Sequence, residues 1–329
     1  MQGDDVRDRA RIENRSTAEL IEVLGSYDLV VIDEAQHIEN IGTSLKLVAD
    51  NIPGIHVIAT GSSSFELANR LNEPLTGRNR KFILFPLSIQ ELVQAHDQRT
   101  IENTLEEYMI YGTYPEVASS ASSVQKEKAI VHIATDYLFK DIFQLGHIRK
   151  PFVFEKIVQL LALRVGSEIS YAEIAKEVGI SRDILYEYIT MLEQAFIIFR
   201  LTPLYTNKTK EINKSHKIYF WDTGIRNAIL RAFTPMDLRG DKGAIFENFF
   251  IAEKMKERIY SGRYTEAHFW RDRAGAEIDF VESTPTNDTI HAYECKWKDG
   301  AAVPRAFTTL YPHASFSVIT ARTLVAHFV

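Results

Sequence analysis

Cysteine is nearly absent from this sequence of 329 residues, which contains Cys295 alone. A single thiol excludes an intrachain disulfide and a metal cluster held by several thiolates. The sequence also has no run of about 18 apolar residues, the length that a membrane-spanning helix requires. Residues 1–15 are polar and charged, unlike the start of a secretory signal. We therefore expect a cytoplasmic protein that does not associate with a membrane.

An excess of positive charge is also missing. Lys and Arg total 38 against 44 Asp and Glu, so the formal net charge is −6. The net charge therefore argues against binding nucleic acid through bulk charge, while a local basic patch stays open. Residues 200–242 form such a patch, with nine Lys or Arg and four acids. This segment is either a solvated face or a contact surface for nucleic acid.

Two short apolar runs, residues 28–34 and 56–61, predict strands buried on both faces, as in a parallel sheet. Residues 42–51 between them have helical spacing, which completes a β-α-β unit with a right-handed crossover. The later patterns predict helices over 62–71, 88–117, from about 124, from about 151 and from about 243, and strands over 81–85, 268–270, 277–281, 291–296 and 316–319.

Two acids, Asp33 and Glu34, end the first predicted strand. An acid pair after an apolar strand is the pattern in which the first carboxylate binds Mg²⁺ and the second polarises the water that attacks a γ-phosphate. Thr60 and Ser62, at the end of the next strand, offer hydroxyl groups to that phosphate or water. The alternatives are a chance acid pair and a serine that only caps the following helix.

Several motifs together resemble a family of prokaryotic AAA+-type P-loop ATPases that carry a C-terminal region of uncharacterised function. The resemblance covers nearly the whole chain and implies ATP and Mg²⁺ as cofactors. It implies that Asp33 and Glu34 are the Mg²⁺ and water pair and that Thr60 or Ser62 is a sensor. It makes Arg78 a candidate charge-stabilising arginine, with a plain surface arginine as the alternative. The matching segments are residues 27–67, 75–78, 85–88, 111–116, 217–224 and 294–296.

One family motif is not present. The phosphate loop of such ATPases reads Gly-x-x-x-x-Gly-Lys-Ser/Thr, because backbone N–H groups and the lysine hold the phosphates. None of the 16 glycines of this chain is followed by lysine. The sequence resembles a family member whose first strand and phosphate loop precede residue 1. We expect impaired nucleotide binding. Either residues 81–85 pair with the strand over 56–60, or the sheet keeps an open edge that favours self-association into a homo-oligomer.

Residues 169–195 predict a helix-turn-helix. Ser170 and Ser181 are placed to cap two short helices, and Gly179 ends the first of them. β-rich segments over 196–203 and 217–221 complete the pattern of a winged helix. Such a fold binds DNA or serves as a scaffold for protein contacts. The candidate DNA contacts are Arg182 on the second helix and, in the wing region, Asn207, Lys208, Lys210, Lys214 and Lys217.

Four residues near the C-terminus match the PD-(D/E)xK nuclease pattern, which the resemblance also implies. Asp279 ends one strand, Glu294 and Lys296 share a face of the next, and Glu247 lies on a helix. In that pattern the acids hold a divalent metal and the lysine orients the attacking water. The alternative is a nuclease-like fold that binds without cleaving. Cys295 points to the opposite face and predicts a core position.

The predicted protein is therefore an α/β protein of three parts. Residues 1–120 form a truncated P-loop NTPase-type parallel sheet, residues 121–240 a helical linker and winged helix-turn-helix, and residues 241–329 a PD-(D/E)xK nuclease-like α/β domain. The predicted metal ligands are Asp33, Asp279 and Glu294. The first functional hypothesis is a DNA-interacting ATPase relative with impaired nucleotide binding. The alternatives are a metal-dependent nuclease and a non-catalytic module that binds DNA or protein.

Overall fold

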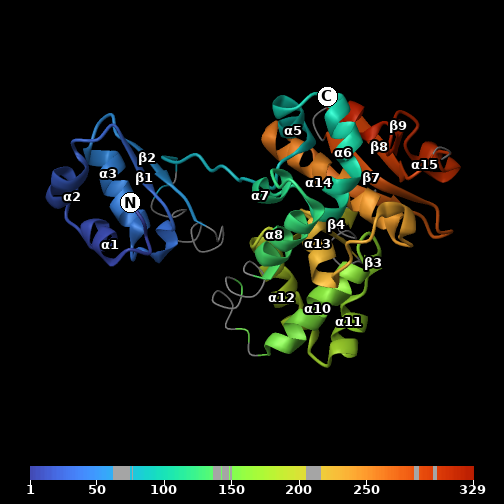
Figure 1. Ribbon diagram of the computed structural model, residues 1–329, viewed down its shortest axis with the longest axis horizontal. Helices are drawn as coiled ribbons and strands as arrows, with labels where there is room; N and C mark the ends of the chain where they lie inside the picture. The colour runs from blue at the N-terminus through green and yellow to red at the C-terminus, as the bar shows by residue number, and fades with distance from the viewer. Residues whose placement is uncertain are drawn as a thin grey trace. The chain divides into compact units, whose positions relative to one another are not determined.

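A computed structural model gives the fold in two compact units, residues 1–84 and, in the main, the residues from 85 onwards (Figure 1). The structure describes residues 1–61, 75, 77–135, 142, 148, 150–204, 216–284, 289–298 and 302–329. The predicted helix over 62–71 lies outside these residues, and so do Ser62, Asn207, Lys208, Lys210 and Lys214.

The first unit contains the predicted β-α-β arrangement. Strands β1 and β2 pair in parallel, with Leu29 opposite His56 and Ile32 opposite Ala59. On the other edge of β1, the backbone N–H of Gly3 donates to the Asp33 carbonyl at 2.7 Å. The elements are α1 (Val6–Ile12), α2 (Thr17–Leu24), β1 (Leu29–Ile32), the 3-10 helix η1 (Ala35–His37), α3 (Ile41–Asn51) and β2 (His56–Ala59).

The expectation that both strands are buried on two faces is wrong. Val30 and Ile32 are buried in a core built with the three helices, whereas Leu29, Val31 and Ile58 are 52%, 44% and 50% exposed. The reason is that residues of α1, α2 and α3 share a single core with only one set of alternating β1 side chains. Residues 81–85 are also not a strand, since they form no ladder with β2. In the described part of this unit, β1 and β2 are therefore the whole sheet.

The second unit begins with helices in the predicted places. Ser88 and Glu91 form a capping box at the start of α5, and Asp97 caps α6 by accepting from the Thr100 N–H at 3.0 Å. These elements are α5 (Ile89–Ala95), α6 (Gln98–Tyr111), α7 (Pro115–Ala118), α8 (Ser123–Thr135) and α10 (Pro151–Leu163).

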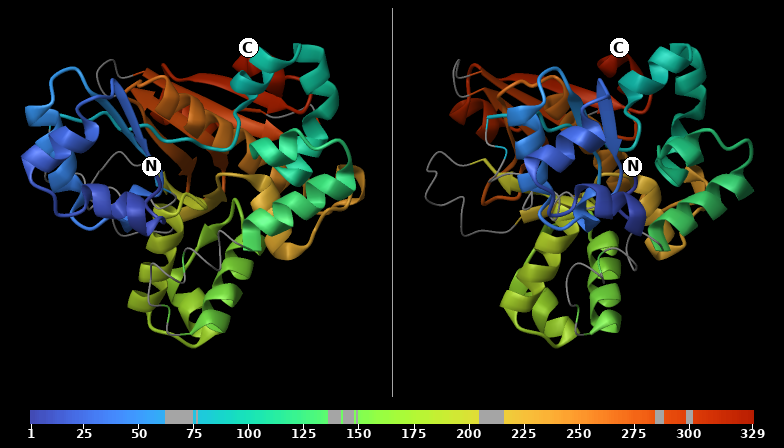
Figure 2. Two further views of the ribbon diagram at one scale, coloured as in Figure 1. Left: turned by 60° about the vertical axis from the view of Figure 1, so that its left-hand side comes forward. Right: turned by 90° about the vertical axis from the view of Figure 1, so that its left-hand side faces the viewer.

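The two helices expected over 169–195 are present, joined by Gly179 at φ +75°. Ser170 and Ser181 accept hydrogen bonds from the N–H groups of Glu173 and Ile184, as caps do. Three antiparallel strands in the order β3-β5-β4 lie with them. The elements are β3 (Glu168–Ile169), α11 (Tyr171–Val178), α12 (Arg182–Gln194), β4 (Ile198–Pro203) and β5 (His216–Phe220). In both views of Figure 2, α10, α11 and α12 form one helical group.

The four strands expected near the C-terminus are also present, and they extend the same sheet. Strand β4 pairs in parallel with β6 at Thr202 and His268, which gives a seven-stranded sheet in the order β3-β5-β4-β6-β7-β8-β9. Helix α14 packs on β5 and β8. The elements are α13 (Thr223–Leu230), η4 (Met236–Leu238), α14 (Lys242–Tyr260), β6 (Glu266–Arg271), β7 (Glu277–Thr284), β8 (Thr289–Lys296), α15 (Arg305–Leu310), β9 (Ser315–Thr320) and α16 (Leu324–Phe328). Over the described residues, every helix is too short or too polar to cross a membrane.

Candidate functional site

The acid at the end of β1 and the hydroxyl at the end of β2 meet. The Thr60 hydroxyl donates a hydrogen bond to Asp33 Oδ1, and both side chains are exposed. The meeting follows from the parallel pairing, because the carboxyl ends of parallel strands lie at one edge of a sheet, where ligands of open α/β sheets bind. Glu34 adopts a left-handed conformation (φ 50°) and accepts a hydrogen bond from Gln36 at 2.5 Å.

The arginine predicted for this site has another partner. Arg78 Nε lies 2.8 Å from Asp50 Oδ1, in the last turn of α3. The structure therefore pairs Arg78 with an acid of its own unit, which is the surface-arginine alternative. Ser62, the other hydroxyl expected here, lies outside the described residues.

A second group of acids converges in the other unit. Asp279 on β7 is 8% exposed and accepts a hydrogen bond from the Cys295 N–H at 2.7 Å. Burial, followed by the charges of Glu247 and Glu294, raises the pKa of Asp279 to about 8. The direction is the one expected, with burial as the first cause and the crowding of like charges as the second. Lys296 lies beside this group, with Nζ 2.6 Å from Glu294 Oε1.

Sequence reasoning missed the residues of β5 that reach this group. Lys217 Nζ lies 3.3 Å from Glu247 Oε1 and forms a closer ion pair with Glu277. The Tyr219 hydroxyl donates to the same Glu247 oxygen at 2.6 Å. Burial by itself lowers the pKa of Lys217, but the charges of Glu247 and Glu277 raise it above its ordinary value. The expectation that Lys217 contacts phosphates is wrong, because its side chain is 3% exposed.

The acids of this second group do not form a ready metal site. Within the described ranges, no three His, Cys, Asp or Glu side chains are arranged to hold a metal ion. The side chains of two of these acids already have partners: Glu247 contacts a lysine and a tyrosine, and Asp279 accepts from a backbone N–H. Metal binding by Asp33 at the edge of the first sheet stays a prediction.

The candidate DNA contact on α12 is accessible. Arg182 is the first residue of that helix and is exposed. Two acids, Asp183 and Glu187, are exposed beside it. The Tyr186 ring lies 5.1 Å from the Arg200 guanidinium, a cation–π contact that fixes the ring on the same helix.

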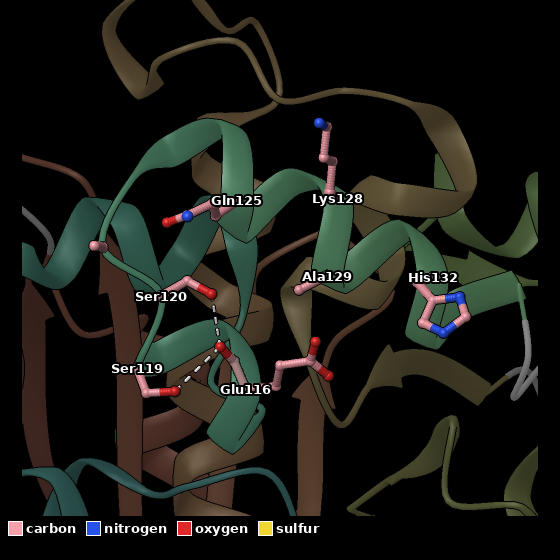
Figure 3. Close-up of a pocket in the computed structure, with 8 residues that line it drawn as sticks. Glu116, Ser119, Ser120, Gln125, Lys128, Ala129 and His132 are labelled. Carbon is pink, nitrogen blue, oxygen red and sulfur yellow. Dashed lines mark hydrogen bonds between the residues drawn. The ribbon is translucent and has the colours of Figure 1, made fainter.

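A pocket of about 570 Å³ opens between α7 and α8 (Figure 3). The hydroxyls of Ser119 and Ser120 bond to the Glu116 carbonyl at 3.3 and 2.8 Å, so they are directed to the backbone. None of the residues predicted for catalysis or DNA contact lines it. Its lining residues are Glu116, Ser119, Ser120, Ala121, Gln125, Lys128, Ala129 and His132.

Two of the segments that resemble the family, residues 111–116 and 217–224, contact each other closely. Asp222 accepts hydrogen bonds from the N–H of Thr113 at 2.7 Å and of Ile225 at 3.0 Å. The bond from Ile225 caps α13, and the bond from Thr113 holds the segment that follows α6. A Cβ atom on Gly112 would lie 2.0 Å from Asp222 Oδ1, and one on Gly224 would lie 2.0 Å from the Tyr111 carbonyl oxygen. These segments therefore pack closely against each other, with the Asp222 carboxylate hydrogen-bonded between them.

The stability of the second unit is expected to fall as pH rises from about 4 to about 8. Asp279 keeps its proton to about pH 8 when folded, while an aspartate in an unfolded chain loses it near pH 4. The folded state then binds more protons than the unfolded state, which costs up to about 1.4 kcal/mol per pH unit in this window. Urea denaturation at several pH values should show the slope, and Asp279→Asn should flatten it. Parallel curves for the two proteins would contradict the prediction.

Three separate parts of the chain match models of known protein domains. Residues 1–93 match the model of an AAA domain. Residues 102–235 match a domain of unknown function (DUF8612), and residues 242–325 match another (DUF4143).

Two proteins that match most of this chain are uncharacterised. An uncharacterised protein of Mycobacterium tuberculosis is 26% identical over 267 residues, which cover 80% of this chain and 58% of that protein. One of Methanocaldococcus jannaschii is 28% identical over 265 residues, covering 76% and 57%. This chain thus spans little more than half the length of these relatives. Among solved structures, the Walker-type ATPase of Pyrococcus abyssi aligns with a TM-score of 0.42 and 19% identity, over 66% of this chain and 69% of that one.

Proposed function

We propose that this protein is an AAA-type ATPase relative that contacts DNA and that, as this 329-residue chain, binds ATP poorly. The observation that carries the proposal is the Thr60–Asp33 hydrogen bond at the carboxyl edge of β1 and β2, within the residues that match an AAA domain. This pair supplies one Mg²⁺ ligand and one phosphate-facing hydroxyl. A phosphate cradle is still needed, and no glycine of the sequence is followed by lysine.

The chain is expected to show no ATP hydrolysis above background. A Mg²⁺ ligand without a phosphate loop leaves the β- and γ-phosphates without the N–H groups that hold them. Phosphate release and calorimetric titration with Mg-ATP would measure this, with Asp33→Asn as the control that should behave like the wild type. Micromolar ATP binding that disappears in Asp33→Asn would refute this prediction and show that Asp33 takes part in a functional nucleotide site.

DNA contact is proposed for the helices and strands between α10 and β5. Their order, α10-β3-α11-α12-β4-β5 with strands arranged β3-β5-β4, supports a winged helix. In such a fold the second helix of the helix-turn-helix enters the major groove with its N-terminal residues first. Arg182 is exposed at that end of α12, so it is the residue proposed to reach the DNA.

Replacing Arg182 with alanine should weaken binding to duplex DNA by about tenfold, the usual scale for one arginine contact. Arg305 offers a matched control, because it is also the exposed first residue of a helix, α15. Fluorescence anisotropy with a labelled duplex at low and moderate salt would measure both variants. Equal losses in the two variants would point to nonspecific charge, and no binding by the wild type would refute DNA contact.

The alternative function is metal-dependent DNA cleavage by a PD-(D/E)xK-like domain. The convergence of Glu247, Asp279 and Glu294 favours it. The contact of Lys217 with Glu247 opposes it, because a cation already neutralises that carboxylate. We therefore assign the C-terminal residues a binding role in this proposal, the third of the hypotheses that the sequence leaves open.

A further inference from the structure

The acid cluster consists of Glu247 on α14, Asp279 on β7 and Glu294 on β8, and a buried lysine lies beside it. Lys217 comes from β5, and its side chain is 3% exposed. Its Nζ contacts Glu247 at 3.3 Å and pairs more closely with Glu277. An ammonium group so deeply buried is held by its acid partners, since burying a lone charge is costly.

The same carboxylate of Glu247 is enclosed from other directions. The Tyr219 hydroxyl donates to its Oε1 at 2.6 Å. The turn before β3 also lies against it, because a Cβ atom on Gly166 would be 3.1 Å from that oxygen. Glu247 is thus occupied by groups of the α10–β5 segment, and a metal ion at this oxygen would have to displace them.

The other two acids keep some capacity for a ligand. Glu294 Oε1 pairs with Lys296, but its Oε2 is buried and has no hydrogen-bond partner in the part of the chain that the structure describes. Asp279 is in turn close enough to Glu247 and Glu294 for their charges to act on it. Carboxylate oxygens are the ligands that Mg²⁺ and Mn²⁺ prefer. The donor chemistry suits a metal, while the position of Lys217 does not.

We propose that Lys217, paired with Glu247 and Glu277, is a built-in cation beside Asp279 and Glu294 and that it keeps divalent metal ions out of this group of acids. Coulomb repulsion between the ammonium and a divalent cation is strong at short range in a buried site. The ion pair with Glu247 also removes part of the negative charge that would attract a metal. This inference concerns the acid cluster alone, and it stands or falls independently of nucleotide binding and of DNA contact by α12.

The test is metal binding by the full chain and by Lys217→Met, a variant that keeps the length of the side chain and removes its charge. The wild type should show no calorimetric Mn²⁺ binding that depends on Asp279 and no rise in melting temperature with Mn²⁺. Lys217→Met should melt lower without metal, because it leaves buried acids uncompensated. It should then bind Mn²⁺ and regain melting temperature as Mn²⁺ is added.

Lys296→Met is the matched control, because its lysine also pairs with an acid of the cluster but is 43% exposed. It should gain no Mn²⁺ binding. The double variant Lys217→Met/Asp279→Asn should lose the binding that the single variant gains, which places the metal in the cluster. Lys217→Gln serves as a second neutral variant if Lys217→Met does not fold.

Two results would overturn the proposal. One is Mn²⁺ binding by the wild type that Asp279→Asn abolishes, since the lysine would then not exclude the metal. The other is a folded Lys217→Met or Lys217→Gln that binds no Mn²⁺, since the acids would then not form a latent metal site. Mn²⁺ binding by the wild type through Asp279 overturns the proposal even if neither neutral variant folds.

Discussion

Gly224→Ala is expected to destabilise the second unit by about 3 kcal/mol or more, at the upper end of the range for overpacking. A Cβ atom on Gly224 would lie 2.0 Å from the carbonyl oxygen of Tyr111 and 2.6 Å from the amide nitrogen of Gly112. Both are backbone atoms at the C-terminal end of α6, so a side-chain rotation does not relieve the clash. Helix α13 would have to move away from α6, and the Asp222 caps would be lost with it.

Gly243→Ala is the control for this substitution. Gly243 lies in the first turn of α14, and a Cβ atom there meets no heavy atom within 4 Å. Alanine should leave stability unchanged or raise it by up to about 1 kcal/mol, because alanine favours helix over glycine. Chemical denaturation followed by tryptophan fluorescence would compare the two variants. Equal stabilities would show that the α6–α13 contact is looser than the structure indicates.

Lys256→Met is expected to cost about 3 to 5 kcal/mol, the range for breaking a buried ion pair from one side. Lys256 Nζ lies 2.8 Å from Glu253 Oε1, and both side chains are 2% exposed. The lysine also donates to the Leu87 carbonyl, and Glu253 accepts from the Ile89 N–H. The pair therefore ties α14 to the start of α5, and the substitution leaves a buried carboxylate without its counter-charge.

The exposed pair of Arg164 and Glu177 provides the comparison. Its nitrogen and oxygen are also 2.8 Å apart, but the two side chains are 36% and 40% exposed. Arg164→Met should cost less than about 1 kcal/mol, because water screens a surface pair. Urea denaturation of both variants at one pH would measure the difference. A cost for Lys256→Met as small as that for Arg164→Met would refute a stabilising role for the buried pair.

Local sequence determined most of the elements and two of the meeting points between them. The serines at 170 and 181 and the glycine at 179 placed α11 and α12, because caps and left-handed turns depend on a few adjacent residues. The parallel pairing of β1 and β2 brought Asp33 to Thr60 as expected. The strand pattern likewise brought Asp279 close to Glu294 on the neighbouring strand.

Only the tertiary structure decided which faces and charges were buried. The apolar run of β1 predicted burial on both faces, yet the helices of its unit cover only one face of the strand. The composition of a strand does not specify how many layers of structure pack on it. Lys217 stands in a basic segment that favours a surface, yet β5 carries it into a cluster of acids from α14 and β7. Those partners lie 30 and more residues further along the chain, and no local pattern encodes their approach. Long-range packing alone determined that this lysine neutralises acids instead of meeting phosphate.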